Sequence, residues 1–201
     1  MTKETLTFIF YGIVGSGKGT QVELLQKYLK DNDISEDVLF ISTGNEYRKL
    51  INGDNYTSEI VKVNLEKGFL QPDFLTTSLL TDILIKNMKE KTSLITDGFP
   101  RTISQSEDFD FMMKFYSREN IKIIYIELSK DEAIKRMKLR GRSDDTDEGI
   151  ANRFDEYLNN VIPSMNYFKD KERYEIIAIN GEQSIEDVQE EIINKIKPYF
   201  I

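Results

Sequence analysis

The first residues that suggest chemistry form a glycine-rich stretch, Gly12–Thr20, directly after an apolar run. Glycines allow a tight turn in which successive backbone N–H groups point inward at phosphate oxygens. A helix that begins after the turn adds the partial positive charge of its N-terminus, and Lys18 adds a full charge. Thr20 offers a hydroxyl to a phosphate or to Mg²⁺, so the stretch predicts a nucleotide-phosphate site rather than a simple glycine-rich turn. The residues expected to contact the phosphates are Gly15, Ser16, Gly17, Lys18, Gly19 and Thr20.

A second candidate is the segment Asp97–Thr102, which follows another apolar run. In an open α/β sheet, a carboxylate at the C-terminal end of a buried strand faces the ligand crevice. Asp97 is therefore placed to order water molecules bound to Mg²⁺. The alternative is an ordinary turn, because Asp-Gly before Phe-Pro is also a common turn sequence.

A third cluster gathers arginines around two aspartates. Its members are Arg136, Arg140, Arg142 and Arg153, with Asp144 and Asp145. Phosphoryl transfer depends on positioning and on charge neutralisation more than on acid–base chemistry, and forked guanidinium groups suit phosphate oxygens. A flap that brings arginines in on closure also excludes water. The competing interpretation is a charged surface helix with salt bridges.

Composition narrows the classes of function. The net charge of -8 argues against a general binder of nucleic acid or membrane surfaces. The absence of cysteine and histidine excludes disulfides, thiolate zinc sites and most histidine-dependent hydrolase mechanisms. We see neither a signal-peptide pattern nor a bilayer-spanning stretch, so we expect a cytoplasmic protein.

Short apolar runs alternate with helix-period segments along the whole chain, which predicts an α/β fold: a doubly wound, five-stranded parallel sheet with helices on both faces. The expected strands are Leu6–Tyr11, Val38–Ile41, Ser93–Thr96, Ile121–Leu128 and Tyr174–Ile179. Residues 43–88 hold about three helices, more than one crossover needs. Pro163 is expected to kink the helical segment that contains it.

Together these segments resemble the nucleoside monophosphate kinases of the P-loop NTPase class, and most closely the short-lid adenylate kinases. Gly19 separates Lys18 from Thr20, as in that family, and Gln21 follows. Ser42-Thr43-Gly44 with Arg48 resembles another family segment, although by itself this pattern is also a plain helix cap. The resemblance covers essentially the whole chain. It implies one domain, 1–201, with a core (1–42, 73–136, 148–201), a monophosphate-binding flap (43–72) and a short lid (137–147).

The resemblance implies reversible transfer of a phosphoryl group from Mg-ATP to AMP, giving two ADP, and we expect a monomer. Catalytic roles fall to Lys18, Arg101, Arg140, Arg142 and Arg153. Arg136, Arg140 and Gln183 join the glycine-rich loop in binding ATP. AMP would contact Thr43, Gly44, Arg48, Phe69, Gln71, Gly98, Arg101, Gln105, Arg142 and Arg153. Mg²⁺ would be held by Thr20 and, through water, by Asp97.

The chain departs from the family pattern at a few positions. Asn45 stands where the family usually has Asp, which puts magnesium affinity or rate in doubt, and Val14 stands where Pro is common. The short lid without cysteine implies no structural zinc. Two other functions stay open: a UMP/CMP kinase, against which Thr43 and Gln105 argue, and a non-catalytic nucleotide-binding regulator, which Asn45 alone favours.

Overall fold

The computed structural model of this chain describes residues 5–35, 37–142 and 145–200. Its centre is a five-stranded, all-parallel sheet in the order β2-β3-β1-β4-β5, which confirms the predicted fold class. The strands are β1 (Thr7–Tyr11), β2 (Asp37–Ser42), β3 (Thr92–Asp97), β4 (Ile121–Glu127) and β5 (Tyr174–Asn180). Each strand end lies within one residue of its predicted position, and the residues that the structure adds at strand ends are all polar.

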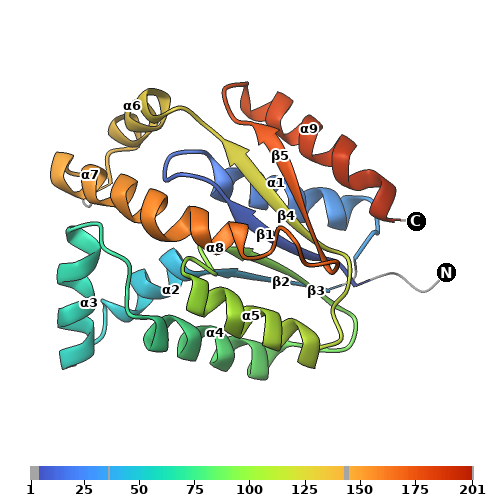
Figure 1. The fold of residues 1–201 in the computed structure, drawn as a ribbon, viewed down its shortest axis with the longest axis horizontal. Coiled ribbons are helices and arrows are strands. Elements are labelled where there is room, and N and C mark those ends of the chain that lie inside the picture. The colour runs from blue at the N-terminus through green and yellow to red at the C-terminus, as the bar shows by residue number, and fades with distance from the viewer. Residues whose placement is uncertain (1–4, 36, 143–144, 201) are drawn as a thin grey trace.

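Helices cover both faces of the sheet, with α1 and α9 on one side and α4, α5 and α8 on the other (Figure 1). Between β2 and β3 the chain forms the three helices expected there: α2 (Thr43–Leu50), α3 (Tyr56–Glu66) and α4 (Asp73–Asn87). The remaining α-helices are α1 (Lys18–Asp31), α5 (Ile103–Phe115), α6 (Lys130–Arg140), α7 (Asp147–Glu156), α8 (Ile162–Asn166) and α9 (Ile185–Ile196). A 3₁₀ turn, Lys197–Phe200, follows α9.

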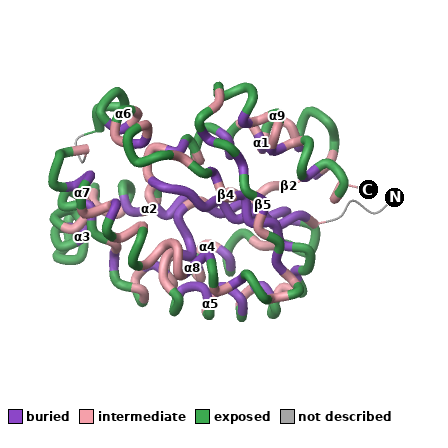
Figure 2. The backbone as a smooth tube through the Cα atoms, turned by 45° about the horizontal axis from the view of Figure 1, so that its top comes forward, coloured by how far each residue is buried: buried purple, intermediate pink, exposed green. Residues whose placement is uncertain are grey.

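The core has two layers because successive residues of a strand point to opposite faces of the sheet. In β1, Phe8 and Phe10 pack with the apolar face of α1 and α9, whereas Ile9 and Tyr11 pack with α4 and α5. The strands therefore form the buried centre seen in Figure 2, and the outer helix faces are exposed. Burial on both faces explains why these strands are continuously apolar.

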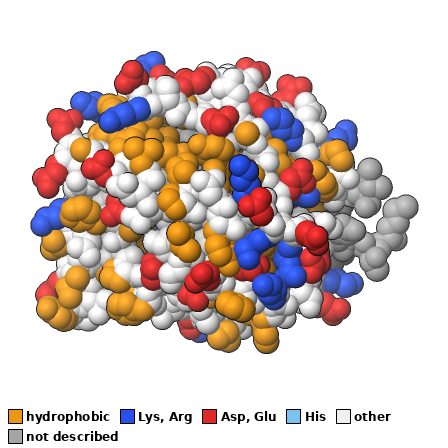
Figure 3. Space-filling view, viewed as in Figure 1, with side chains coloured by type: hydrophobic (Ala, Val, Ile, Leu, Met, Phe, Trp, Pro, Cys, Tyr) orange, Lys and Arg blue, Asp and Glu red, His pale blue; other side chains and the backbone are white. Residues whose placement is uncertain are grey.

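A third, smaller cluster ties the glycine-rich loop to two helices. Ile13 of the loop packs with Ala133 and Met137 of α6 and with Ile150 and Phe154 of α7. Figure 3 shows apolar side chains gathered between α6 and α7. The loop and the arginine-bearing helices thus share one packing unit.

The proline expected to kink a helix lies just after a π-helical turn. The helical segment runs from α7 through a π turn, Tyr157–Val161, into α8, and Pro163 is near the start of α8. Proline has no N–H and its ring clashes with the carbonyl four residues earlier, so a wider turn at this point accommodates it. In the part of the chain that the structure describes, no helix combines the length and apolarity needed to cross a bilayer.

Candidate active site

A cleft of about 470 Å³ opens at the C-terminal ends of the parallel strands, where the chain leaves β1, β2 and β3 for the following loops. Several sequence motifs meet there. From the glycine-rich loop and its helix come Gly15, Gly17, Lys18, Gly19 and Thr20. From the other candidate segments come Gly44, Arg48, Phe69, Asp97, Gly98, Arg101, Arg136, Arg140, Arg142 and Arg153.

The glycine-rich loop is shaped by close packing that a side chain would prevent. Gly12 has a φ of 144°, and a Cβ there would lie 2.6 Å from the Ile126 carbonyl oxygen. Gly15 has a φ of 93°, and its Cβ would lie 2.8 Å from the Ala133 carbonyl oxygen of α6. Because only glycine tolerates both the backbone conformation and the contact, the loop is held tightly against β4 and α6.

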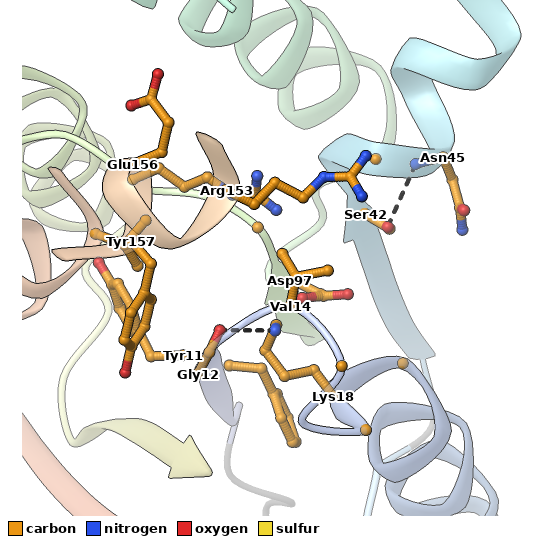
Figure 4. A pocket seen from close by; sticks show the side chains of 18 of the residues that line it. Tyr11, Gly12, Val14, Lys18, Ser42, Asn45, Asp97, Arg153, Glu156 and Tyr157 are labelled. Atoms are coloured by element: carbon orange, nitrogen blue, oxygen red, sulfur yellow. Dashed lines mark hydrogen bonds between the residues drawn. The ribbon is translucent and has the colours of Figure 1, made fainter. Parts of the chain in front are cut away.

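Lys18 reaches back over this loop. Its Nζ donates to the carbonyl oxygens of Gly12, at 2.7 Å, and of Ile13, at 2.9 Å (Figure 4). Burial lowers the pKa of Lys18 from 10.5 to about 8; the negative charge of Asp97 opposes this shift, and Arg101 adds to it. A buried cation held only by neutral oxygens gains strongly from an anion.

Asp97 ends β3 and lies beside Lys18 in the cleft (Figure 4). Its Oδ1 is buried and accepts no hydrogen bond from any described residue. The structure contains no cluster of three or more acidic, histidine or cysteine side chains among the residues it describes. One carboxylate suits Mg²⁺, which keeps several of its waters and is commonly shared between few carboxylates and substrate phosphates. Asp97 therefore fits the magnesium role expected of it.

Two further arginines line the cleft. Arg101 is half-buried, and it packs so closely on Gly98 that a Cβ there would lie 2.7 Å from Arg101 Nη2. Burial lowers the pKa of Arg101, although the Asp97 charge opposes the shift. Arg48 of α2 donates from Nη2 to Asn45 Oδ1 at 2.7 Å. The amide of Asn45 is thus engaged with an arginine.

The arginines of the third cluster converge on one buried carboxylate. Asp145 accepts two hydrogen bonds from Arg140, at 2.7 and 3.0 Å, and one from Arg153 Nη1 at 2.9 Å. The backbone N–H of Arg142 donates to it as well, at 3.2 Å. The side chain of Asp145 is 1% exposed. Burial raises the pKa of Asp145, but Arg140 and the other donors together hold it below the usual value.

This carboxylate organises the arginines around the cleft, and Arg136 pairs separately with Glu132 at 2.9 Å. Asp144, the other aspartate of the predicted cluster, lies outside the described residues. The surface-helix interpretation fits Arg136 in part, since it forms a salt bridge within α6. Arg140 and Arg153 instead pair with a buried group.

Five predicted site residues do not line the cleft as the structure presents it: Ser16, Thr43, Gln71, Gln105 and Gln183. Thr43 donates its hydroxyl to the Gly98 carbonyl at 2.8 Å. Gln183 donates to Glu191 at 2.6 Å, beyond β5. The side chains of Thr43 and Gln105 are buried and hydrogen-bonded to residues of other segments, so their motif positions do not bring them into the cavity.

The sequence interpretation missed part of the cleft wall. Glu156, Tyr157 and Val161, on α7 and the π turn, line the cavity. Glu156 Oε1 accepts a hydrogen bond from the Leu70 N–H at 3.4 Å. The spacing of Arg153, Tyr157 and Val161, four residues apart, places them on one helical face. That spacing is the sequence signal by which these residues can be found.

Comparison with known proteins matches this arrangement to one family. A sequence model described as "Adenylate kinase" matches residues 10–173, which include all three motif segments. The adenylate kinases of Flavobacterium psychrophilum and Parabacteroides distasonis are each 32% identical to the chain. These alignments cover 95% and 96% of this chain, respectively, and 100% of each relative. The adenylate kinase of Azobacteroides pseudotrichonymphae is 34% identical, over 94% of this chain and 96% of its own length.

Proposed function

Because this chain belongs to the adenylate kinase family, we propose that its cleft transfers a phosphoryl group reversibly between Mg-ATP and AMP, giving two ADP. The protein is a phosphotransferase with a phosphate acceptor. One observation supports the chemistry above the others: Lys18, Arg101 and the arginines around Asp145 enclose a single cleft. Such a site can position two phosphate chains and neutralise the charge that develops during transfer.

The donor side comprises the glycine-rich loop and Lys18, with Arg136 and Arg140 near ATP. Backbone N–H groups and the start of α1 favour phosphate oxygens, and Lys18 exchanges its carbonyl partners for an anion. Gln183 would approach the adenine of ATP through backbone atoms, since its side chain is held by Glu191. Mg²⁺ held by Thr20 and the waters of Asp97 would screen the phosphate charge and align the two phosphate chains.

The acceptor side lies across the cleft, between α2, the α3–α4 turn and the loop after β3. Arg48 and Arg101 would hold the AMP phosphate, while Arg142 and Arg153 close over the transferring group. Thr43, Phe69, Gln71 and Gln105 are assigned to the AMP nucleoside on the family pattern. Thr43 and Gln105 are buried behind the cleft wall. AMP would therefore contact them only after α2 or the loop that follows β3 moves.

In this proposal residues 43–72 form the monophosphate-binding flap and residues 137–147 the short lid. Each contributes residues to the cleft: Arg48 and Phe69 come from the flap, and Arg140 and Arg142 come from the lid. We further propose a monomeric, cytoplasmic enzyme that binds no nucleic acid. The net charge of -8 supports the last point, because a nucleic-acid binder needs a basic surface.

The test is ADP formation by the purified protein with Mg-ATP and each of AMP, CMP, UMP and GMP. We expect strong preference for AMP. Preference for CMP or UMP would contradict the acceptor assignment, and ATP binding without transfer to any acceptor would favour a regulator instead.

Variants sharpen this test. Arg101→Ala is expected to lower kcat/KM by about 10²–10³-fold, because it removes a cation from the site where charge develops during transfer. Lys135→Ala is the control, since Lys135 lies on α6 next to Arg136, is 68% exposed and forms a salt bridge with Glu132 on the same helix. Equal activity of Arg101→Ala and Lys135→Ala would refute the proposed role.

A further inference from the structure

Asp73, an acidic residue outside the cleft, connects the start of α4 to the start of α5. Asp73 is the first residue of α4, and α4 follows the flap directly. Its Oδ1 accepts hydrogen bonds from Gln105 Nε2, at 2.8 Å, and from Thr102 Oγ1, at 3.0 Å. Both partners belong to the start of α5. A carboxylate at a helix N-terminus commonly serves its own helix, but this one binds a different helix.

The carboxylate dictates the orientation of the Gln105 amide. Gln105 is 1% exposed, and its Oε1 accepts the backbone N–H of Arg101 at 2.9 Å. A carboxylate only accepts hydrogen bonds, so the amide NH₂ must face Asp73 and the amide oxygen must face Arg101. A flipped amide would place two donors together at Arg101 and two acceptors together at Asp73. Each unmet contact in a buried position is costly.

The same network fixes the start of α5. The Thr102 hydroxyl caps the helix by accepting the Gln105 N–H at 3.2 Å, and it gives its only proton to Asp73. The backbone of Arg101 is thereby held next to Gly98, where the guanidinium packs in the cleft wall. Asp73 thus contacts none of the cavity but supports the segment that carries Arg101.

We propose that Asp73 is a positioning residue for the acceptor nucleotide, acting through Gln105 and Thr102 on the loop that carries Arg101. This inference rests on the proposed function. Because α4 begins where the flap ends, the contact also sets the distance between the flap and the Arg101 loop. Loss of the contact weakens binding of the monophosphate and leaves binding of ATP at the glycine-rich loop unchanged.

The experiment compares wild type, Asp73→Ala and Asp73→Asn in steady-state assays, and measures AMP and ATP affinity by calorimetry. We expect Asp73→Ala to raise KM and Kd for AMP about tenfold, since two hydrogen bonds to a charged group are lost, with ATP constants within about twofold. Asp73→Asn keeps an acceptor oxygen and is expected to retain AMP constants within about threefold of wild type. Preference for AMP over CMP falls in Asp73→Ala, because the Gln105 amide is free to flip.

Asp82→Ala is the matched control, because Asp82 lies on the same helix, is exposed and forms a salt bridge with Lys86 on that helix. Equal changes in the AMP and ATP constants, or no change in either, would overturn the inference. A wild type that binds AMP without transferring phosphate would reject the proposed function, and the calorimetric comparison would still decide the role of Asp73. A wild type that does not bind AMP would overturn both.

Discussion

At the scale of single residues, the environment of Lys18 favours binding of an anion next to its ammonium group. Its ammonium group is partly buried and donates hydrogen bonds to two backbone carbonyls of its own loop. Burial lowers its pKa to about 8, so the protonated form predominates below that pH and is lost above it. A bound phosphate stabilises the protonated form and raises the pKa again. The free enzyme and the complex should therefore titrate differently.

We accordingly expect kcat/KM for ATP to fall as pH rises through about 8, while kcat falls only at higher pH. Rates measured from pH 6.5 to 10 would check this. Lys18→Arg is the control, because a guanidinium stays protonated over that range and removes the dependence at a lower overall activity. A wild-type kcat/KM that stays level to pH 10 would contradict the expected titration.

At the scale of elements, the turn after α3 meets α7 through two glycines. Gly68, in the turn after α3, has a φ of 78°, and a Cβ there would lie 2.4 Å from the Gly149 carbonyl oxygen of α7. Next to this contact Asn152 Nδ2 donates to the Lys67 carbonyl at 2.8 Å. The turn that bears Phe69 is therefore seated on α7, close to Arg153. Under the proposed function, this contact would link closure of the acceptor side to the placement of Arg153.

Gly68→Ala is expected to push the turn away from α7, raising KM for AMP and lowering the free energy of unfolding by about 1–3 kcal/mol. Kinetics and urea denaturation measure the two effects. Gly141→Ala is the control for backbone strain alone, because Gly141 has a φ of 61° and no atom of the described residues lies within 4 Å of its Cβ position. Equal stability of Gly68→Ala and Gly141→Ala, with an unchanged KM for AMP, would show that the contact between the turn and α7 does not contribute to AMP binding.

At the scale of the whole molecule, stability rests on two apolar layers that sandwich one sheet. In the layer under α4 and α5, Phe109 is fully buried, and its ring lies 6.0 Å from that of Phe99 and 6.4 Å from that of Phe168. Phe99 belongs to the loop that carries Arg101. The core on this side thus supports the site directly.

Phe109→Ala is expected to lower the free energy of unfolding by about 3–5 kcal/mol, because it leaves a cavity among aromatic rings. Phe111→Ala, on the same helix but 69% exposed, is expected to change it by about 0.5 kcal/mol or less. Urea denaturation would measure both free energies, provided that the denaturant dependence (m value) is the same in wild type and variants. Similar losses in the free energy of unfolding of the two variants would contradict the assignment of Phe109 to the core.

Much of this architecture follows from local sequence. Buried parallel strands are continuously apolar, so the five runs could be located, and glycines at strained positions mark the loop before α1. The family pattern added the roles of Asp97, Arg101 and the lid arginines. These residues lie within short motifs, whose neighbours along the chain largely determine where they point.

Only the tertiary structure decided how side chains from distant segments are paired. Gln105 bonds Asp73, 32 positions away, and Thr43 bonds Gly98, 55 positions away, so neither side chain faces the cleft. Glu156 and Tyr157 enter the cavity because a π turn and the flap meet there. Hydrogen-bond partners and cavity walls depend on which elements pack together, and sequence periodicity reports which face of an element is buried but not its partner.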